Sequence, residues 1–381
     1  MGPLQGFKII ELAGLGPGPF CAMLLADMGA DVIRIDRLSG GGVPLPIDPE
    51  KDVYNRNRRS IAMDLKSPEA IEAILKLCEG ADALIEGFRP GVMERLGLGP
   101  DVCLARNPRL VYGRMTGWGQ HGALAQSAGH DINYLAISGA LSMIGRKGQP
   151  PVPPSNLVAD MGGGGLMLAY GITCALLEAG RSGKGQVVDA AMTEGAAVLS
   201  AGHYGLRAMG IVKDQHGVNM GDTGSYFYEV YETKDGKYFS VGAIEPQFYN
   251  ELVEKMGLDK ASLPNQWDVS KWDDMKKVFA DTFKTKTRDE WTAIFEGTDA
   301  CASPVLTPAE VADYKHNKDR GSFVTVNGLL QPAPAPRLSR TPGEIVRTPP
   351  KPGEHTNEIL RDWGFGDSDI KTLADTGAIN S

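Results

Sequence analysis

The chain has 381 residues, 42% of them hydrophobic and 23% charged, and a formal net charge of −8. This length exceeds that of one average domain, and the composition is typical of a globular protein. The negative charge disfavours extended contact with nucleic acid or an anionic membrane surface, so neither is expected as a partner. Five widely spaced cysteines without a Cys-x-x-Cys motif indicate free thiols in a reducing compartment.

The N-terminal part of the chain has the pattern of a strand, a helix and a second strand. Residues 8–12 predict a buried strand, residues 20–28 a helix that stops before Gly29, and residues 31–36 the next strand. Such a βαβ unit indicates a parallel sheet. Later strands of this sheet are expected at residues 57–65, 83–86, 110–115 and within 183–190.

The turn between the first strand and helix contains Gly14, Gly16 and Gly18, interrupted by Pro17 and Pro19. This spacing differs from the G-x-G-x-x-G fingerprint of dinucleotide-binding folds. The turn therefore argues against a nicotinamide enzyme and fits a tight strand-to-helix connection.

Basic side chains follow the predicted strands. Arg37 and Arg89 stand at strand ends, which is the edge where open α/β sheets bind their ligands. The same part of the chain also contains Arg56, Arg58, Arg59, Lys66 and Arg95. A solvated basic surface explains any one of these residues. Several that converge at strand ends favour a polyphosphate ligand such as a free nucleotide or coenzyme A.

Asp160 is followed after one residue by four glycines, Gly162 to Gly165, and then by an apolar helix through Leu177. Asp160 is either the cap of this helix or a functional carboxylate. Glycines are poor helix formers, so capping alone does not explain four in a row. They suit a close approach of substrate, with the amides of Asp160 and the glycines receiving an oxyanion. The helix start is expected to keep Asp160 ionised.

The pattern changes after residue 222. Residues 226–231 and 237–241, joined by Asp235-Gly236, predict a β-hairpin. A long apolar helix at 191–209 precedes it, and charged amphipathic helices follow near 246–256 and 287–296. We therefore expect a large α/β domain at 1–200, a linking helix and connection at 201–222, a small α+β domain at 223–327, and a C-terminal segment at 328–381 that returns to the large domain.

Of the six histidines, His130 has a distinctive context. It lies in a glycine-led loop after a strand and shortly before Asp160, so the two form a candidate acid/base pair. No histidine pair or acidic cluster has metal-binding spacing, and no metal is expected. Neither a Gly-x-Ser-x-Gly elbow nor a Walker loop occurs.

Four motifs together resemble the α-methylacyl-CoA racemases of the family III CoA-transferase superfamily. They are Gly129-His-Asp-Ile-Asn-Tyr134, Val241-Gly-Ala-Ile-Glu-Pro-Gln-Phe-Tyr249, Gly183-Lys-Gly-Gln-Val-Val-Asp189 and Leu12-Ala-Gly-Leu-Gly-Pro-Gly-Pro19. The similarity runs from Leu4 to about Arg337, nearly the whole chain. Where the family usually has Asp-Gly-Gly-Ala-Pro, this chain has Asp222-Thr-Gly-Ser-Tyr226, a change expected to affect that loop or the acyl pocket.

The resemblance implies an α/β fold with a large Rossmann-like domain and a smaller α+β domain. It also implies an interlocked homodimer whose site lies between the large domain of one chain and the small domain of the other. The substrate would be a 2-methylacyl-CoA thioester, and no cofactor or metal would be needed. His130 and Asp160 would be the two bases, and Glu245 would pair with His130. CoA contacts would fall on Arg37, Met63, Asp64, Leu65, Lys66, Gly87, Phe88, Arg89, Arg95, Gly129, His130, Asp131, Ile132, Asn133 and Tyr134.

The implied activity interconverts (R)- and (S)-2-methylacyl-CoA by 1,1-proton transfer through an enolate. This needs one acid and one base on opposite faces of the same carbon, and a carboxylate with an imidazole can supply them near neutral pH. The alternative is a family III CoA-transferase in which Asp160 is the nucleophile. Because the first seven residues lack a signal-like apolar core, a cytoplasmic location is expected.

Overall fold

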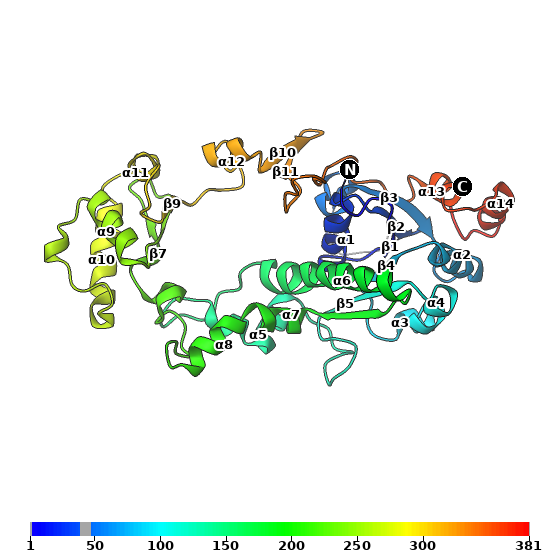
Figure 1. The fold of residues 1–381 in the computed structure, drawn as a ribbon, viewed down its shortest axis with the longest axis horizontal. Helices are drawn as coiled ribbons and strands as arrows, with labels where there is room; N and C mark the ends of the chain where they lie inside the picture. Colours follow the sequence, from blue (N-terminus) through cyan, green and yellow to red (C-terminus); the bar gives the residue numbers. More distant parts are fainter. Residues whose placement is uncertain (1, 39–46, 381) are drawn as a thin grey trace. The chain divides into compact units, whose positions relative to one another are not determined.

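The computed structural model describes residues 2–38 and 47–380. The chain divides into two compact units, whose elements are labelled in Figure 1. The first unit comprises Met1–Ser138, Ser155–Leu199 and His316–Ser381, and the second comprises Gly139–Pro154 and Ser200–Lys315. The chain therefore enters the second unit twice, first for a short segment and then for a longer one.

The first unit is built on a parallel sheet with the order β3-β2-β1-β4-β5-β6 in the described residues. The strands are β1 (Lys8–Leu12), β2 (Asp31–Arg37), β3 (Arg58–Met63), β4 (Ala83–Glu86), β5 (Val111–Thr116) and β6 (Val187–Ala191). This order confirms the predicted Rossmann-like sheet. Because all pairings are parallel, the carboxyl ends of the strands meet at one edge.

The first unit also contains helices, some of which connect the strands of the sheet while others follow it in the C-terminal segment. They are α1 (Pro17–Asp27), α2 (Pro68–Glu79), α3 (Val92–Arg95), α4 (Pro100–Arg106), α5 (Asp131–Ser138), α6 (Met167–Ser182), α7 (Met192–Leu199), α12 (Lys315–Arg320), α13 (Thr356–Asp362) and α14 (Asp367–Asp375). The shorter helical turns are η1 (Pro49–Lys51), η2 (Val53–Asn55) and the π-helix η4 (Leu157–Leu166). A two-stranded hairpin, β10 (Phe323–Val326) and β11 (Leu329–Pro332), lies near the C-terminus of the chain.

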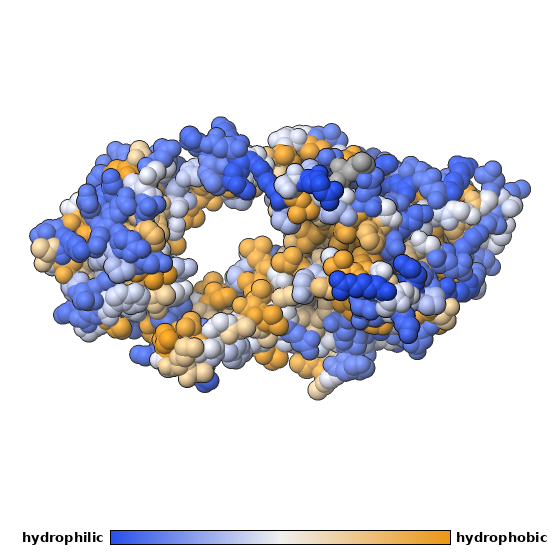
Figure 2. All heavy atoms as spheres, in the orientation of Figure 1, coloured by the Kyte–Doolittle hydropathy of each residue, from blue (hydrophilic) through white to orange (hydrophobic). Residues whose placement is uncertain are grey.

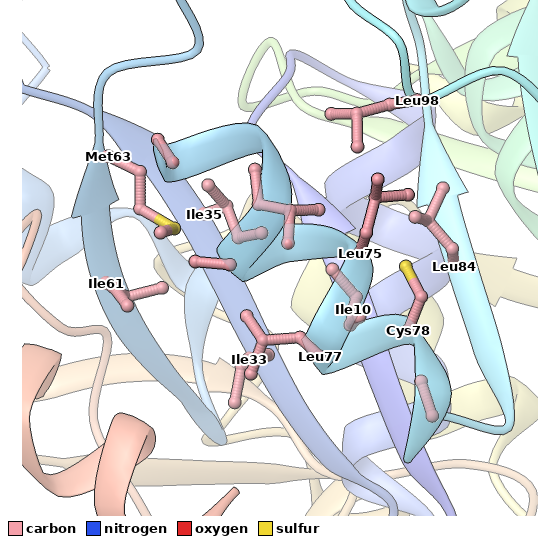
Figure 3. Close-up of a cluster of buried hydrophobic side chains, with 14 of the residues drawn as sticks. Ile10, Ile33, Ile35, Ile61, Met63, Leu75, Leu77, Cys78, Leu84 and Leu98 are labelled. Atoms are coloured by element: carbon pink, nitrogen blue, oxygen red, sulfur yellow. The ribbon is translucent and has the colours of Figure 1, made fainter. Parts of the chain in front are cut away.

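Helix α2 illustrates how local sequence fixes the packing of this unit. Ser67 caps the helix by accepting the amide of Ala70, and Pro68 occupies its first turn. Apolar residues on one face of α2 pack on the β-branched side chains of β1 to β3 (Figure 3). Ile359 and Leu360 of α13 belong to the same core, so the C-terminal segment completes it.

Helix η4 continues into α6 as one long helical segment. Gly113 in β5 allows α6 to pack closely, because a Cβ there would lie 2.9 Å from Ile172 Cδ1. The combined segment Leu157–Ser182 is long and apolar enough to cross a membrane by length and composition, but 44% of its most apolar window is buried inside the protein. Core helices of globular proteins pass the same test, so this is weak evidence for a membrane span.

The second unit has a three-stranded antiparallel sheet, β7-β8-β9, within the described residues. Its elements are η3 (Ala140–Met143), α8 (Ala201–Ala208), η5 (Met220–Gly224), β7 (Tyr228–Glu232), β8 (Tyr238–Gly242), α9 (Pro246–Lys255), η6 (Lys260–Ser262), η7 (Val269–Lys271), α10 (Trp272–Phe283), α11 (Arg288–Phe295) and β9 (Ala302–Pro304). The predicted hairpin is confirmed, with Gly236 in the left-handed conformation at its turn. The core is aromatic, with Trp291 wholly buried 5.1 Å from the ring of Phe283.

The prediction of one apolar helix at 191–209 is wrong. The segment forms α7 and α8, which are separated at Ser200 and fall in different units. Helix α10 was not predicted, although its buried residues Trp272, Met275, Phe279 and Phe283 follow a helical spacing.

The atypical segment at 222–226 lies in the second unit, where it forms a loop and enters the core of that unit. Tyr226 is wholly buried in the aromatic core of the second unit, where its hydroxyl shares a hydrogen bond of 2.7 Å with that of Tyr249. Thr223 is left-handed, with φ of 72°. A β-branched residue is strained in this conformation.

We expect Thr223→Gly to raise the free energy of unfolding by ~1 kcal/mol, because glycine relieves a strain that exceeds its extra entropy in the unfolded chain. Urea denaturation measures the change. Thr285→Gly, at an exposed residue with negative φ, is the control and should lower stability. If both variants lost the same free energy of unfolding, the strain assigned to Thr223 would be contradicted.

Candidate active site

A cavity of about 740 Å³ lies at the carboxyl edge of the parallel sheet in the first unit. The turn after β1, the η2 segment, the end of β4 and the start of η4 contribute its walls. His130 and Asp160 both line it. The structure therefore brings the two predicted acid/base groups to one cavity.

His130 immediately precedes α5 and is held by the backbone of that helix. Its carbonyl accepts the amides of Asn133 at 2.8 Å and Tyr134 at 3.2 Å. Its own amide donates to Asn133 Oδ1 at 3.1 Å. The residue is exposed, so its ring is accessible from the cavity.

The four glycines after Asp160 serve helix packing, which corrects the expectation that they admit substrate. A Cβ on Gly163 would lie 2.6 Å from the amide nitrogen of Ala196 in α7. A Cβ on Gly165 would lie 2.6 Å from the carbonyl oxygen of Pro17 in α1. These contacts leave no room for a side chain, so the glycines let η4 pack against both helices. Asp160 itself lies inside η4, whose cap position is Asn156.

The predicted oxyanion donors at Asp160 and the glycines are also wrong. The amide of Asp160 donates to Asp131 Oδ2 at 2.8 Å. The glycine amides lie beyond the first turn of η4, where carbonyls of the helix accept them. At the start of α5, by contrast, the amides of Asp131 and Ile132 have no acceptor among the described residues.

Burial in the cavity wall raises the pKa of Asp160 to about 6, and the negative charge of Asp131 adds to this effect. The charge of His130 acts in the opposite direction, because a cation favours the carboxylate. The raised pKa opposes the expected effect of the helix start, and Asp160 is nevertheless mainly ionised at pH 7. A carboxyl group with a pKa near 6 can both take up and release a proton close to neutral pH.

The basic residues separate into two groups. Arg56, Arg58 and Arg59 are buried and form ion pairs with Asp27, Glu11 and Asp31, respectively. Their charges are already paired within the fold, so these three arginines are not available to a phosphate. The remaining cations are exposed and form no ion pair among the described residues. They are Arg37, Lys66, Arg89 and Arg95.

The other residues predicted to bind CoA lie at the same sheet edge. The side chain of Met63 is wholly buried, and the carboxylate of Asp64 accepts the amide of Lys66 at 3.0 Å. Gly87 lines the cavity, and the amide of Phe88 donates to Glu86 at 2.7 Å. Leu65 packs partly buried against the core.

Glu245 lies in the second unit at the cap position of α9. It is exposed, and its carboxylate has no hydrogen-bond partner among the described residues. Its predicted pairing with His130 stays a prediction.

Sequence reasoning missed several residues that line the cavity, among them Leu15, Lys51, Tyr54 and Met192. Tyr54 packs edge-on against Phe20 with ring centroids 5.7 Å apart. Its pKa is raised first by burial, then by the negative charges of Asp52 and Asp160. The η2 turn that carries Tyr54 has no periodic pattern in the sequence.

In the part of the chain that the structure describes, no cluster of His, Cys, Asp and Glu could hold a metal ion.

A family model described as CoA-transferase family III matches residues 4–356. The chain therefore belongs to CoA-transferase family III. The alpha-methylacyl-CoA racemase of Mus musculus is 49% identical over 372 residues, which cover 97% of this chain and 96% of the relative. The human alpha-methylacyl-CoA racemase is 48% identical over 382 residues, which cover 99% of this chain and 98% of the relative.

More distant relatives have other activities in their names. The succinyl-CoA–L-malate CoA-transferase beta subunit of Chloroflexus aurantiacus is 31% identical, covering 97% of this chain and 96% of the relative. A crystal structure of a CAIB/BAIF family protein from Brucella suis aligns with a TM-score of 0.82 at 27% identity, covering 95% of this chain and 99% of that one. Relatives of this chain thus carry the names of different reactions, so family membership by itself does not fix the activity.

We expect Asp160→Asn to raise the free energy of unfolding by ~1–2 kcal/mol at pH 7.5. This is less than the whole pKa shift would give, because the carboxyl group is partly solvated. The raised pKa means that ionisation of Asp160 costs stability as pH rises from about 4 to about 6. The gain in the variant should therefore disappear near pH 4. Urea denaturation at both pH values tests this.

Asp235→Asn is the matched control, because the pKa of Asp235 is shifted in the opposite direction. A hydrogen bond from Thr233 lowers the pKa of Asp235, so this variant should lose stability at pH 7.5. A gain in Asp160→Asn that is the same at pH 4 and pH 7.5 would contradict the raised pKa.

Proposed function

We propose that this enzyme interconverts (R)- and (S)-2-methylacyl-CoA thioesters by 1,1-proton transfer. The observation that carries the proposal is the presence of His130 and Asp160 in one cavity. The names of the relatives that are 49% and 48% identical over nearly their full lengths support it. We further propose that the reaction needs no cofactor, because CoA is part of the substrate.

The CoA moiety would lie along the carboxyl edge of the sheet. Arg37, Lys66, Arg89 and Arg95 offer positive charge there without competing acidic partners in the described residues. Guanidinium and ammonium groups suit the phosphates of CoA. The thioester end would then enter the cavity, where apolar residues such as Leu15 and Met192 can contact the acyl chain.

In one direction the carboxylate of Asp160 removes the C2 proton from one face of the substrate. His130 in its imidazolium form then donates a proton to the opposite face. The reverse direction begins with neutral His130 and protonated Asp160. The amides of Asp131 and Ile132 are the proposed donors to the enolate oxygen, replacing those at Asp160. Glu245 is proposed to accept a hydrogen bond from His130 and to fix its tautomer.

The second candidate is a CoA-transferase that uses Asp160 as the nucleophile. Family membership and the Chloroflexus relative favour it. That reaction needs no imidazole opposite the carboxylate. The presence of His130 in the same cavity therefore favours proton transfer.

We expect the wild-type enzyme in D₂O to exchange the C2 hydrogen of both enantiomers and to erase their optical activity. His130→Ala and Asp160→Ala should each lower racemisation by about 10²- to 10⁴-fold, because each removes the group serving one face. Each variant should still exchange the C2 hydrogen of one enantiomer, and the two should differ in which. Proton NMR and polarimetry measure both properties.

His121→Ala, which changes an exposed histidine outside this cavity, is the control and should behave as wild type. Transfer of CoA to added carboxylic acids without C2 exchange would favour the transferase. Loss of exchange with both enantiomers in both variants would contradict the assignment of one base to each face.

We also propose a homodimer in which a second copy covers an exposed apolar face of the first unit. Figure 2 shows apolar side chains gathered over the region of α5, α6 and α7. Strongly exposed apolar side chains on these helices and on η4 are Ile137, Leu157, Leu166, Tyr170, Leu177 and Val198. Apolar patches of this kind commonly mark protein interfaces.

The expected cytoplasmic location stays a prediction.

Sedimentation equilibrium should give the wild-type protein twice the mass of one chain. Leu177→Glu should give the mass of one chain, because it places a charge in the interface. Val346→Glu, at an apolar side chain that is 72% exposed elsewhere in the first unit, should leave the dimer intact. A monomeric wild-type protein would exclude this assembly.

A further inference from the structure

The carboxylate of Asp131 connects the two proposed acid/base groups. Asp131 follows His130 directly and is the first residue of α5. Its Oδ2 accepts the amide of Ala159 at 2.9 Å and that of Asp160 at 2.8 Å. The residue beside one base therefore holds the backbone of the other.

This carboxylate is buried and incompletely satisfied. Asp131 is 6% exposed, and its Oδ1 has no hydrogen-bond partner among the described residues. An amide side chain could accept the same two bonds without a buried negative charge. A buried polar atom without a partner is rare in folded proteins and calls for an explanation.

We propose that Asp131 is a positioning residue that sets the spacing between His130 and Asp160 and adapts Asp160 to exchange protons near neutral pH. This rests on the proposed proton-transfer function. It also assigns the Asp131 side chain a role other than the CoA contact that the sequence resemblance implied.

The electrostatic surroundings agree with this role. Among charged groups, Asp131 opposes ionisation of Asp160, whereas His130 favours it. The helices packed on η4 otherwise present uncharged residues to the cavity at this point, Pro17 from α1 and Met192 from α7. Tyr54 and Tyr134 also line the cavity, and burial is the main cause that raises the pKa of each. The charged residues of its other walls are Lys51, Asp52 and Glu86. Removal of the Asp131 charge should therefore lower the pKa of Asp160.

Asp131→Asn keeps an oxygen for the two amides and removes the charge. We expect the acid limb of kcat/KM for C2 exchange to move to lower pH by roughly one unit. The kcat at neutral pH should fall by about tenfold, because Asp160 becomes a weaker base, while KM stays nearly constant. A higher KM with unchanged kcat and acid limb would assign Asp131 to CoA binding and overturn the proposal.

Titration of the Asp160 carboxyl carbon by ¹³C NMR gives a readout that is independent of turnover. The midpoint should be near 6 in the wild type and lower in Asp131→Asn. The same midpoint in both proteins would overturn the proposal, even if the wild type racemises its substrate. Failure of the wild type to exchange C2 hydrogens would instead refute the proposed function and leave this titration interpretable.

Two further variants complete the test. Asp131→Glu retains the charge but displaces the oxygen from the two amides, so kcat should fall while the acid limb moves less than in Asp131→Asn. If Asp131→Glu had the kcat of the wild type, the positioning role would be contradicted. This result would count even if Asp131→Asn failed to fold. Asp82→Asn is the matched control, because Asp82 accepts the amide of Lys8 at 2.8 Å at the opposite end of the strands. Its acid limb should equal that of the wild type.

Discussion

The contact of η4 with α1 and α7 is the constraint on which the site depends. Gly163 and Gly165 bring backbone against backbone, and any side chain at these positions would collide with α7 or α1. Asp160 precedes this packed segment in the same helix, so its position relative to the turn after β1 is fixed. The carboxylate of Asp131 then attaches the start of α5, and His130 with it, to the same helix. The loop before α5 and helix η4 thereby reach one cavity.

The same packing explains the electrostatics of the cavity. Removal of Asp160 from water raises its pKa, because burial disfavours the charged form. The cations that remain free lie along the sheet edge, whereas the buried Arg56, Arg58 and Arg59 form ion pairs with carboxylates of the first unit. Burial thus separates positive charge that stabilises the fold from positive charge that is available to an anionic ligand.

Local sequence patterns predicted the framework well and the tertiary contacts poorly. Strands such as 8–12 and 83–86 were predicted with correct bounds, because buried parallel strands form short apolar runs between turns. His130 and Asp160 were identified as candidates, but the partner of the Asp160 amide was not, since no pattern links residues 131 and 160. The four glycines were assigned to substrate binding, because a sequence cannot show that two helices pack against them. Residue Tyr54 carried no signal, since its role depends on where the η2 turn lies.

The proposed reaction requires an imidazole and a carboxyl group to flank one carbon of a bound thioester. A crystal structure of the enzyme with a 2-methylacyl-CoA substrate tests it most directly. We expect C2 to lie between the ring of His130 and the carboxyl group of Asp160, with the two groups on opposite faces. An acyl group bonded covalently to Asp160, or a C2 atom with both side chains on the same face, would contradict it.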